Sequence, residues 1–236
     1  MKIQTLLELI EPQVKNYNMR GRRFDPETSA ANVSGWSLTA DEKKQGIVGS
    51  GSYSAVKKDR DPHFVQKTSR RVETSKLDGY WYFIKQVIDK RLWENPYFPR
   101  VYQFKKFYQG DNAHYRVKLE NLVNMEDLSR EELIASVTRM VGDDPEDLGI
   151  IQPYFKKHDI KVLIENIFKR IWDGKESKEM DPSLVSAMRT IKKMHLDAKY
   201  GYDLHKGNVM FRRGPHGLHP VIVDPLTKVE EKKPRY

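Results

Sequence analysis

The sequence predicts an α+β fold in which several short strands and one long helix are followed by a mostly helical second half. Three observations support this prediction. Short strand-like stretches, separated by turns that contain glycine or proline, are concentrated before residue 120. One charged, aromatic-rich stretch without proline interrupts them at residues 72–93. After residue 129, apolar residues recur at the spacing of amphipathic helices.

The composition is that of a globular protein large enough to bury a substantial core. The 236 residues are 38% hydrophobic and 11% aromatic, and no stretch approaches the roughly 18 apolar residues of a membrane span. Residues 1–11 lack a basic start and a small-residue cleavage site, so we expect a cytoplasmic protein. No cysteine is present, which excludes disulfides, thiolate catalysis and cysteine-based zinc sites.

The net charge is +9, with 42 Lys and Arg residues against 33 Asp and Glu residues. This charge favours anionic partners such as nucleotide phosphates, acidic proteins or nucleic acid. Because the excess is spread along the chain, we expect most of it to be solvated surface, with a nucleic-acid patch as the alternative. No zinc-finger, helix-turn-helix or RNA-recognition signature accompanies it.

The first 70 residues contain one helical pattern and three strand-like stretches. Residues 3–16 have apolar residues at helical spacing, although Pro12 weakens the pattern. A polar stretch rich in glycine, proline, serine and asparagine follows at residues 18–41 and predicts a connecting loop. We then expect an antiparallel meander of three strands, around residues 45–48, 53–57 and 63–67.

Residues 72–93 predict one long helix, which Pro96 and Pro99 terminate. Its apolar face consists of Tyr80, Phe83, Ile84, Val87 and Ile88. Residues 101–107 and 114–119 are strand-like, and the polar Gly110-Asp111-Asn112 between them predicts a hairpin turn. Five strands and one helix are therefore expected before residue 120.

The second half predicts helices with recognisable starts. Ser129 is followed by Glu131 and Glu132, which is typical of a serine cap with an acidic first turn. Residues 156–172 and 182–199 form two further amphipathic patterns, and the second begins with Asp181 as cap and Pro182 as first helical residue.

The stretch from Tyr200 to Pro225 contains the residues that suggest chemistry. Two short apolar runs, 208–211 and 220–223, predict a hairpin that returns Asp224 to the side of Asn208. Phosphoryl transfer needs a carboxylate that orients a hydroxyl, an amide oxygen five residues later for a metal, and a further carboxylate for the same metal. Asp203, Asn208 and Asp224 stand in that order, which is more specific than a turn aspartate or a strand-initiating asparagine taken singly.

The sequence Asp-Leu-His-Lys-Gly-Asn at residues 203–208 resembles the catalytic loop of the protein-kinase and aminoglycoside-phosphotransferase superfamily. The Met194-His195 pair is similar to a Leu-His pair that the family has eight residues before its catalytic aspartate. Within the superfamily, the early serine/threonine protein kinases of short-tailed coliphages have a similar Asp-x-His-x-Gly-Asn-x-Met-Phe stretch and a similar Asp-Pro. Two departures are Gly201 in place of the family's histidine and Pro225 after Asp224.

The resemblance implies a protein-kinase-like two-lobed fold. A nucleotide-covering lobe, with a five-stranded antiparallel sheet and one helix, would occupy residues 42–122. A reduced, mostly helical lobe with the catalytic loop and the metal-binding hairpin would occupy residues 123–236. Residues 1–41 would precede both lobes as a helix and a connecting loop.

The resemblance also implies roles for single residues. Asp203 would orient the acceptor, Lys206 would offset charge on the γ-phosphate, and Asn208 and Asp224 would hold Mg²⁺. Lys67 would reach the ATP phosphates, with Asp78 or Glu73 as its acidic partner. His195 is expected to be a buried histidine that braces the loop. The remaining nucleotide contacts would be Gly49, Ser50, Gly51, Ser52, Tyr53, Val56, Glu120 and Leu122. From their residue types alone, the glycine stretch predicts a plain hairpin turn and Lys67 a solvated lysine.

The expected function is that of an ATP- and Mg²⁺-dependent kinase of the phage serine/threonine type, acting on host proteins. Two alternatives stay open. The motif Asp-Leu-His-x-Gly-Asn is common in those branches of the superfamily that phosphorylate small molecules, which suggests a kinase of a small molecule. Gly201, and Ser54 in place of a third glycine, suggest a kinase-fold protein that works by binding and inhibits a host nucleic-acid enzyme through its basic surface.

Overall fold

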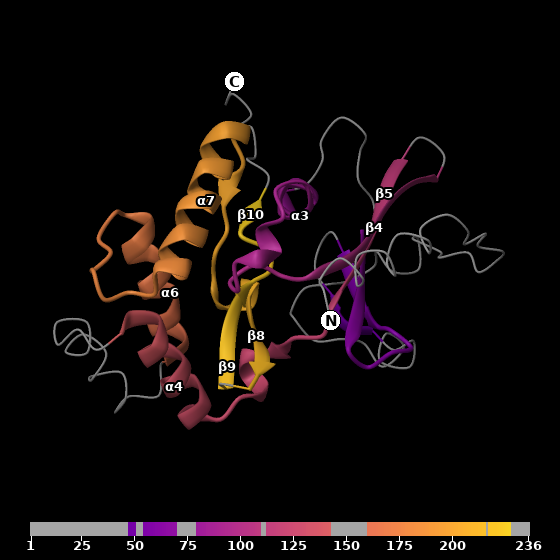
Figure 1. Cartoon of the computed structure of the whole chain (residues 1–236). Helices are drawn as coiled ribbons and strands as arrows, with labels where there is room; N and C mark the ends of the chain where they lie inside the picture. Colours follow the sequence, from indigo (N-terminus) through magenta and orange to yellow (C-terminus); the bar gives the residue numbers. More distant parts are fainter. Residues whose placement is uncertain are drawn as a thin grey trace, which may run out of the picture. The chain divides into compact units, whose positions relative to one another are not determined.

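The computed structural model describes residues 47–50, 54–69, 79–109, 112–142, 160–215 and 217–227 (Figure 1). All of them belong to one unit, Gly35–Tyr236. The helix expected at residues 3–16 and the loop expected at 18–41 lie outside the described residues. The division of the chain after residues 41 and 122 stays a prediction.

The largest sheet is antiparallel and has five strands, in the order β1-β2-β3-β5-β4. Because β3 lies at its centre, Lys67 is paired on both sides, with Val56 and with Val117. The α+β class predicted from the sequence is confirmed. The strands are β1 (Ile47–Ser50), β2 (Ser54–Lys58), β3 (Phe64–Ser69), β4 (Val101–Gln109) and β5 (Asn112–Glu120).

The hairpin between β4 and β5 is confirmed, but its turn is tighter than expected. Gln109 pairs with Asn112, so only residues 110 and 111 connect the strands. Asn112 therefore belongs to β5 and not to the turn. Pairing therefore extends beyond the expected strand ends at residues 107 and 114.

The helix α3 (Gly79–Asp89) packs on this sheet, with the Trp81 ring 4.7 Å from the Phe104 ring. The predicted helix over residues 72–93 is wrong at its C-terminal end, and residues 72–78 lie outside the described part of the chain. Arg91 adopts a left-handed φ of 53°, which a right-handed helix cannot continue, and a short 3₁₀ helix, η2 (Leu92–Glu94), follows. The expected apolar face is confirmed, because Phe83, Ile84 and Val87 are fully buried.

Three further helices are α4 (Arg130–Val141), α6 (Ile160–Trp172) and α7 (Pro182–Ala198). The predicted caps are confirmed. Ser129 and Glu132 form a reciprocal capping box, and Asp181 accepts a hydrogen bond from the backbone N–H of Ser183 at 2.7 Å. None of the helices in the described ranges is long and apolar enough to cross a membrane.

The predicted hairpin of residues 208–223 is confirmed as β8 (Val209–Gly214) and β9 (Gly217–Ile222). β6 (Val123–Asn124) joins it as a third strand, while β7 (Gly201–Tyr202) and β10 (Leu226–Thr227) form a separate two-stranded ladder. α4 packs on β9, and α6 packs on α7 (Figure 1). The three two-residue strands were not predicted.

Candidate active site

Asp203 follows β7 directly and is fixed to the segment that follows Asp224. β7 and β10 are antiparallel, with Tyr202 opposite Leu226. The backbone N–H of Asp203 donates to the carbonyl oxygen of Pro225 at 2.9 Å. The two aspartates, 21 positions apart, therefore lie at the same end of one short ladder.

Gly201 has a structural reason to be glycine. A Cβ at this position would lie 2.9 Å from Cγ2 of Thr227, closer than side-chain carbons normally approach. The absence of a side chain therefore lets β7 and β10 come together.

Asn208 is fixed through both its backbone and its side chain. Its N–H donates to the carbonyl oxygen of His205 at 2.8 Å, and its own carbonyl oxygen accepts from the N–H of Val223 at 2.9 Å. Its side-chain Nδ2 donates to the carbonyl oxygen of Asp203. Since Asp224 follows Val223, the hairpin places Asp224 next to Asn208, as predicted.

Lys67 completes this group from the other half of the chain. Its Nζ lies 2.9 Å from Oδ2 of Asp224, and the two side chains are only 13% and 29% exposed. The same Nζ lies 3.4 Å from the centroid of the Tyr80 ring. The acidic partners expected from the sequence, Asp78 and Glu73, lie outside the described residues.

Burial raises the pKa of the Asp203 carboxyl above its ordinary value of 3.8. The neighbouring His205 and a hydrogen bond from Asn208 lower this pKa, whereas the negative charge of Asp224 raises it further. The net effect is a raised pKa. Asp203 is therefore a better proton acceptor than an ordinary aspartate, which suits a carboxylate that orients or deprotonates a hydroxyl.

His205 and its neighbours form the turn between Asp203 and Asn208. Nδ1 of His205 accepts from the backbone N–H of Gly207 at 3.0 Å, so a neutral ring carries its proton on Nε2, which lies 3.9 Å from Oδ1 of Asp203. Lys206 begins the 3₁₀ helix η4 (Lys206–Asn208). Its side chain is outside what the structure describes, so its role at the γ-phosphate stays a prediction.

The other nucleotide-binding residues are only partly described. Gly49 belongs to β1 and pairs with Val56 on β2, which in turn pairs with Lys67. Ser50 ends β1, and Leu122 is half-buried after β5. The tip of the glycine loop lies outside the described residues: Gly51, Ser52 and Tyr53. All these roles stay predictions.

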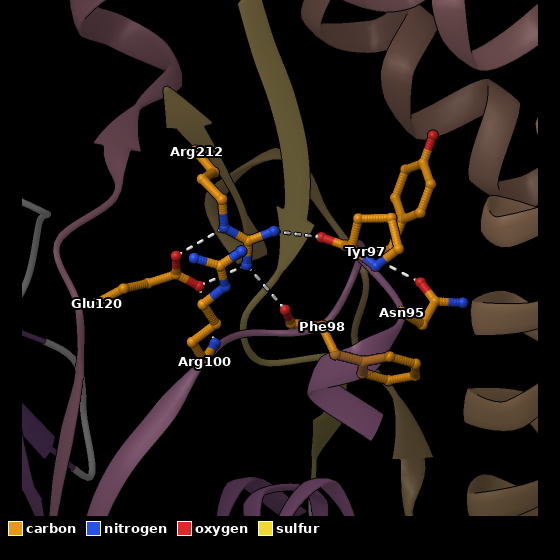
Figure 2. Close-up of polar contacts among 7 residues, drawn as sticks. Asn95, Tyr97, Phe98, Arg100, Glu120 and Arg212 are labelled. Carbon is orange, nitrogen blue, oxygen red and sulfur yellow. Dashed lines mark hydrogen bonds and ion pairs between the residues drawn. The ribbon is translucent and has the colours of Figure 1, made fainter. Parts of the chain in front are cut away.

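Glu120 is buried, and its carboxylate has structural partners (Figure 2). Nε of Arg212 donates to its Oε2 at 2.7 Å, and the backbone N–H of Arg100 donates to its Oε1 at 2.8 Å. The Arg212 guanidinium also donates to the carbonyl oxygens of Pro96 at 2.8 Å and Phe98 at 3.1 Å. The carboxylate is therefore structural, so the predicted nucleotide contact of Glu120 would have to come from its backbone.

His195 supports the loop through two aromatic rings. The His195 and Trp172 rings meet edge to face at 5.2 Å, and Trp172 lies 4.0 Å from the ring of Tyr202, which precedes Asp203. Nδ1 of His195 is buried and has no hydrogen-bond partner among the residues described. His195 as a whole is half-buried and not buried as expected, and its bracing role stays a prediction.

Two residues of the site were missed by sequence reasoning, Tyr80 and Arg212. The sequence predicts Tyr80 on the apolar face of a helix, but nothing in that pattern indicates a lysine partner. Arg212 stands in a strand after Met210 and Phe211, and a charge within an apolar strand is a signal that a buried partner is needed. The sequence alone does not indicate which of the many carboxylates is that partner.

The residues around Asp224 fit a magnesium ion. Oδ2 of Asp224 is bonded to Lys67, and Nδ2 of Asn208 to Asp203, which leaves one carboxylate oxygen and one amide oxygen as ligands. Mg²⁺ prefers such oxygen ligands and commonly combines one or two protein groups with substrate phosphates and water. Within the described ranges, no cluster of three or more His, Cys, Asp or Glu residues offers a different metal site.

No protein-family model matches the chain, and no curated protein matches it either. The geometry of the named residues and the resemblance of the 203–208 motif therefore carry the functional argument.

Proposed function

We propose that this chain is a phosphotransferase that moves the γ-phosphoryl group of ATP to a hydroxyl acceptor with the help of Mg²⁺. The observation that carries this proposal is the ion pair between Lys67 and Asp224. This ion pair joins Lys67, on the central strand β3 of the main sheet, to Asp224, which follows the hairpin of β8 and β9. A sheet lysine and a carboxylate in these positions are the phosphate-binding and metal-binding groups of protein kinases.

On the acceptor side, Asp203 receives the proton of the attacking hydroxyl. A bond forms between the hydroxyl oxygen and the γ-phosphorus as the bond from this phosphorus to the β–γ bridging oxygen breaks, and ADP leaves. The raised pKa of Asp203 favours proton acceptance at this carboxylate. The hydrogen bonds from Asp203 to Pro225 and from Asn208 to Asp203 fix the loop before substrate binds.

On the nucleotide side, Lys67 binds phosphate oxygens, and Asn208 and Asp224 hold the metal. When bound, Mg²⁺ would neutralise part of the negative charge on the phosphate oxygens. Lys67 would then loosen its contact with Oδ2 of Asp224 to reach phosphate oxygens, while the other carboxylate oxygen of Asp224 is available for the metal. The side chains are 13% and 29% exposed, so both are within reach of a ligand.

The acceptor that the motif resemblance favours is a serine or threonine hydroxyl of a host protein. A small-molecule hydroxyl would use the same residues in the same roles. The chemistry at Asp203 does not differ between these two acceptors.

A second candidate function is binding without chemistry, and the Lys67–Asp224 contact itself favours it. The contact occupies the phosphate-binding and the metal-binding group with each other. A chain that kept this pair closed would retain the fold and present its basic surface to a partner. The partner would be a nucleic acid or an acidic surface of a nucleic-acid enzyme, since the net charge is +9.

One experiment separates these possibilities. The protein is incubated with γ-labelled ATP, Mg²⁺ and a bacterial host lysate, and label is scored separately in proteins and in small molecules. We expect protein label with the parent chain, and a loss of about 10²-fold or more in Asp203→Asn. Mg-ATP affinity should stay near that of the parent, because Asp203 faces the acceptor. Asp89→Asn is the matched control, since Asp89 forms an exposed ion pair with Lys85 on α3.

The outcomes exclude different proposals. Label confined to small molecules would replace the protein acceptor by a small one. Mg-ATP binding without any transfer, or a host effect that persists in Asp203→Asn, would favour the binding function over the kinase.

A further inference from the structure

The Lys67 ammonium lies between a carboxylate and an aromatic face. Oδ2 of Asp224 is 2.9 Å away, and the centroid of the Tyr80 ring is 3.4 Å away. Tyr80 is only 4% exposed, and its ring lies 5.7 Å from the ring of Tyr115 on β5. The aromatic side of this arrangement is therefore buried and fixed by packing.

The place of Tyr80 is set by a close approach of α3 to β10. Tyr80 follows Gly79, the first residue of α3, and a Cβ on Gly79 would lie 2.2 Å from the carbonyl oxygen of Leu226. No side chain fits between them. The first turn of α3 therefore lies directly against the backbone two residues beyond Asp224, which brings Tyr80 and Asp224 to the same ammonium group.

The two partners of Lys67, Asp224 and the Tyr80 ring, differ in whether they also bind the metal when a nucleotide is present. Asp224 is the proposed metal ligand, so its oxygens are shared with the metal in the loaded site. An aromatic ring is not a ligand for Mg²⁺, which prefers oxygen, and its negative face attracts an ammonium group without neutralising it. A ring contact therefore orients the charge and leaves it available to phosphate oxygens.

We propose that Tyr80 is a positioning residue that holds the Lys67 ammonium toward the nucleotide phosphates, the task that an acidic helix residue performs in protein kinases. This inference rests on the proposed function of the same site. It assigns the phosphate contact to a pair, Lys67 and Tyr80, and it predicts that the aromatic face, more than the size or the hydroxyl of residue 80, sets the affinity for phosphate-bearing nucleotides.

The test compares Mg-ATP with adenosine, which has no phosphate. Tyr80→Leu should weaken Mg-ATP binding about tenfold and leave adenosine binding near that of the parent. Tyr80→Phe should recover most of the loss, since the ring remains. Tyr82→Leu is the matched control: Tyr82 stands on the same helix, but its ring packs on Tyr200 at 5.1 Å and not on Lys67.

A double-mutant cycle measures the pair directly. In a Lys67→Met background, Tyr80→Leu should produce no further loss of Mg-ATP affinity. The same cycle in urea unfolding without nucleotide should also show coupling between the two positions. If Tyr80→Leu does not fold, phenylalanine is compared with pentafluorophenylalanine at position 80, because fluorination removes the negative face of the ring and keeps its shape.

The two proposals fail in different ways. Additive effects of Tyr80→Leu and Lys67→Met, or equal affinities with the plain and the fluorinated ring, would overturn the role of Tyr80 even if the parent binds Mg-ATP. A parent that binds no Mg-ATP would overturn the proposed function, and with it the role of Tyr80 toward phosphates, although coupling in the unfolding cycle would still show the contact.

Discussion

Among the described residues of the site, Asp203 has a protonation equilibrium that is linked to folding stability. Partial burial raises the pKa of its carboxyl above 3.8, because the loss of part of its hydration favours the neutral acid. Between 3.8 and the raised pKa, the folded protein binds more protons than the unfolded chain. Folding stability therefore falls as pH rises through this interval, and at neutral pH the ionised carboxylate opposes folding to its full extent.

We therefore expect the free energy of unfolding at pH 7 to be larger for Asp203→Asn than for the parent. The amide has nearly the same size as the carboxylate and carries no charge. The difference should shrink as pH falls through the interval and disappear well below 3.8. Urea unfolding at a series of pH values measures this. A variant that is less stable than the parent at pH 7, with no pH trend in the difference, would show that the carboxylate is not destabilised by its surroundings.

Asp224→Ala should abolish ATP turnover, because the chain loses a metal ligand. It should also lower the free energy of unfolding by about 1–3 kcal/mol, since it leaves the 13%-exposed Lys67 without its charged hydrogen-bond partner. Turnover assays and urea unfolding give the two quantities. Asp89→Ala, which removes an exposed aspartate from an ion pair on α3, should change neither appreciably. Unchanged turnover in a folded Asp224→Ala protein would exclude Asp224 as a metal ligand.

At the scale of elements, α4 begins with side-chain hydrogen bonds that a single substitution removes. The Ser129 hydroxyl accepts from the backbone N–H of Glu132 at 3.2 Å, and the Glu132 carboxylate accepts from the backbone N–H of Ser129 at 2.9 Å. Ser129→Ala should lower the free energy of unfolding by about 1 kcal/mol. Thr190→Ala within α7 should stay within about 0.5 kcal/mol, because this exposed hydroxyl bonds only back to its own helix. Equal effects in urea unfolding would mean that the cap does not stabilise the fold.

Elements with a long enough pattern could be predicted from the sequence. The strands of the main sheet, the hairpin that delivers Asp224 and the caps at Ser129 and Asp181 were all foreseen, because local residue types determine them. The end of α3 was not, since the left-handed Arg91 has no sequence signal. Two-residue strands such as β7 and β10 show no periodicity, and they form only because tertiary structure brings them together.

In the whole molecule, Arg212 joins parts that are distant in sequence. It connects β8 to Glu120 at the end of β5 and to the backbone of residues 96 and 98 (Figure 2). The hairpin that follows Asn208 and the segment of Glu120 and Leu122, which is expected to contact the nucleotide, are therefore bonded through one guanidinium group. Sequence reasoning could not find this pair, nor the Lys67–Asp224 pair, because 92 and 157 positions separate the partners.

Arg212→Met should be among the most destabilising substitutions, at about 3–5 kcal/mol, because it leaves the buried Glu120 charge without its partner. Adding Glu120→Gln should recover part of this loss, since the amide is uncharged and its oxygen still accepts from the Arg100 N–H. Urea unfolding of both proteins tests the order. A double variant no more stable than the single one would indicate that lost packing of Arg212, and not an unpaired carboxylate, causes the effect.

The contact between Lys67 and Asp224 also bears on how the molecule is made. A ribosome adds about 5–20 residues per second, so the lysine emerges many seconds before its carboxylate partner. The strands around Lys67 can pair early, because their partners are near in sequence, whereas the site requires closure of a loop of 157 positions. The proposed activity is therefore expected to appear late during synthesis, after the hairpin has emerged and well after the strands around Lys67 have been able to pair.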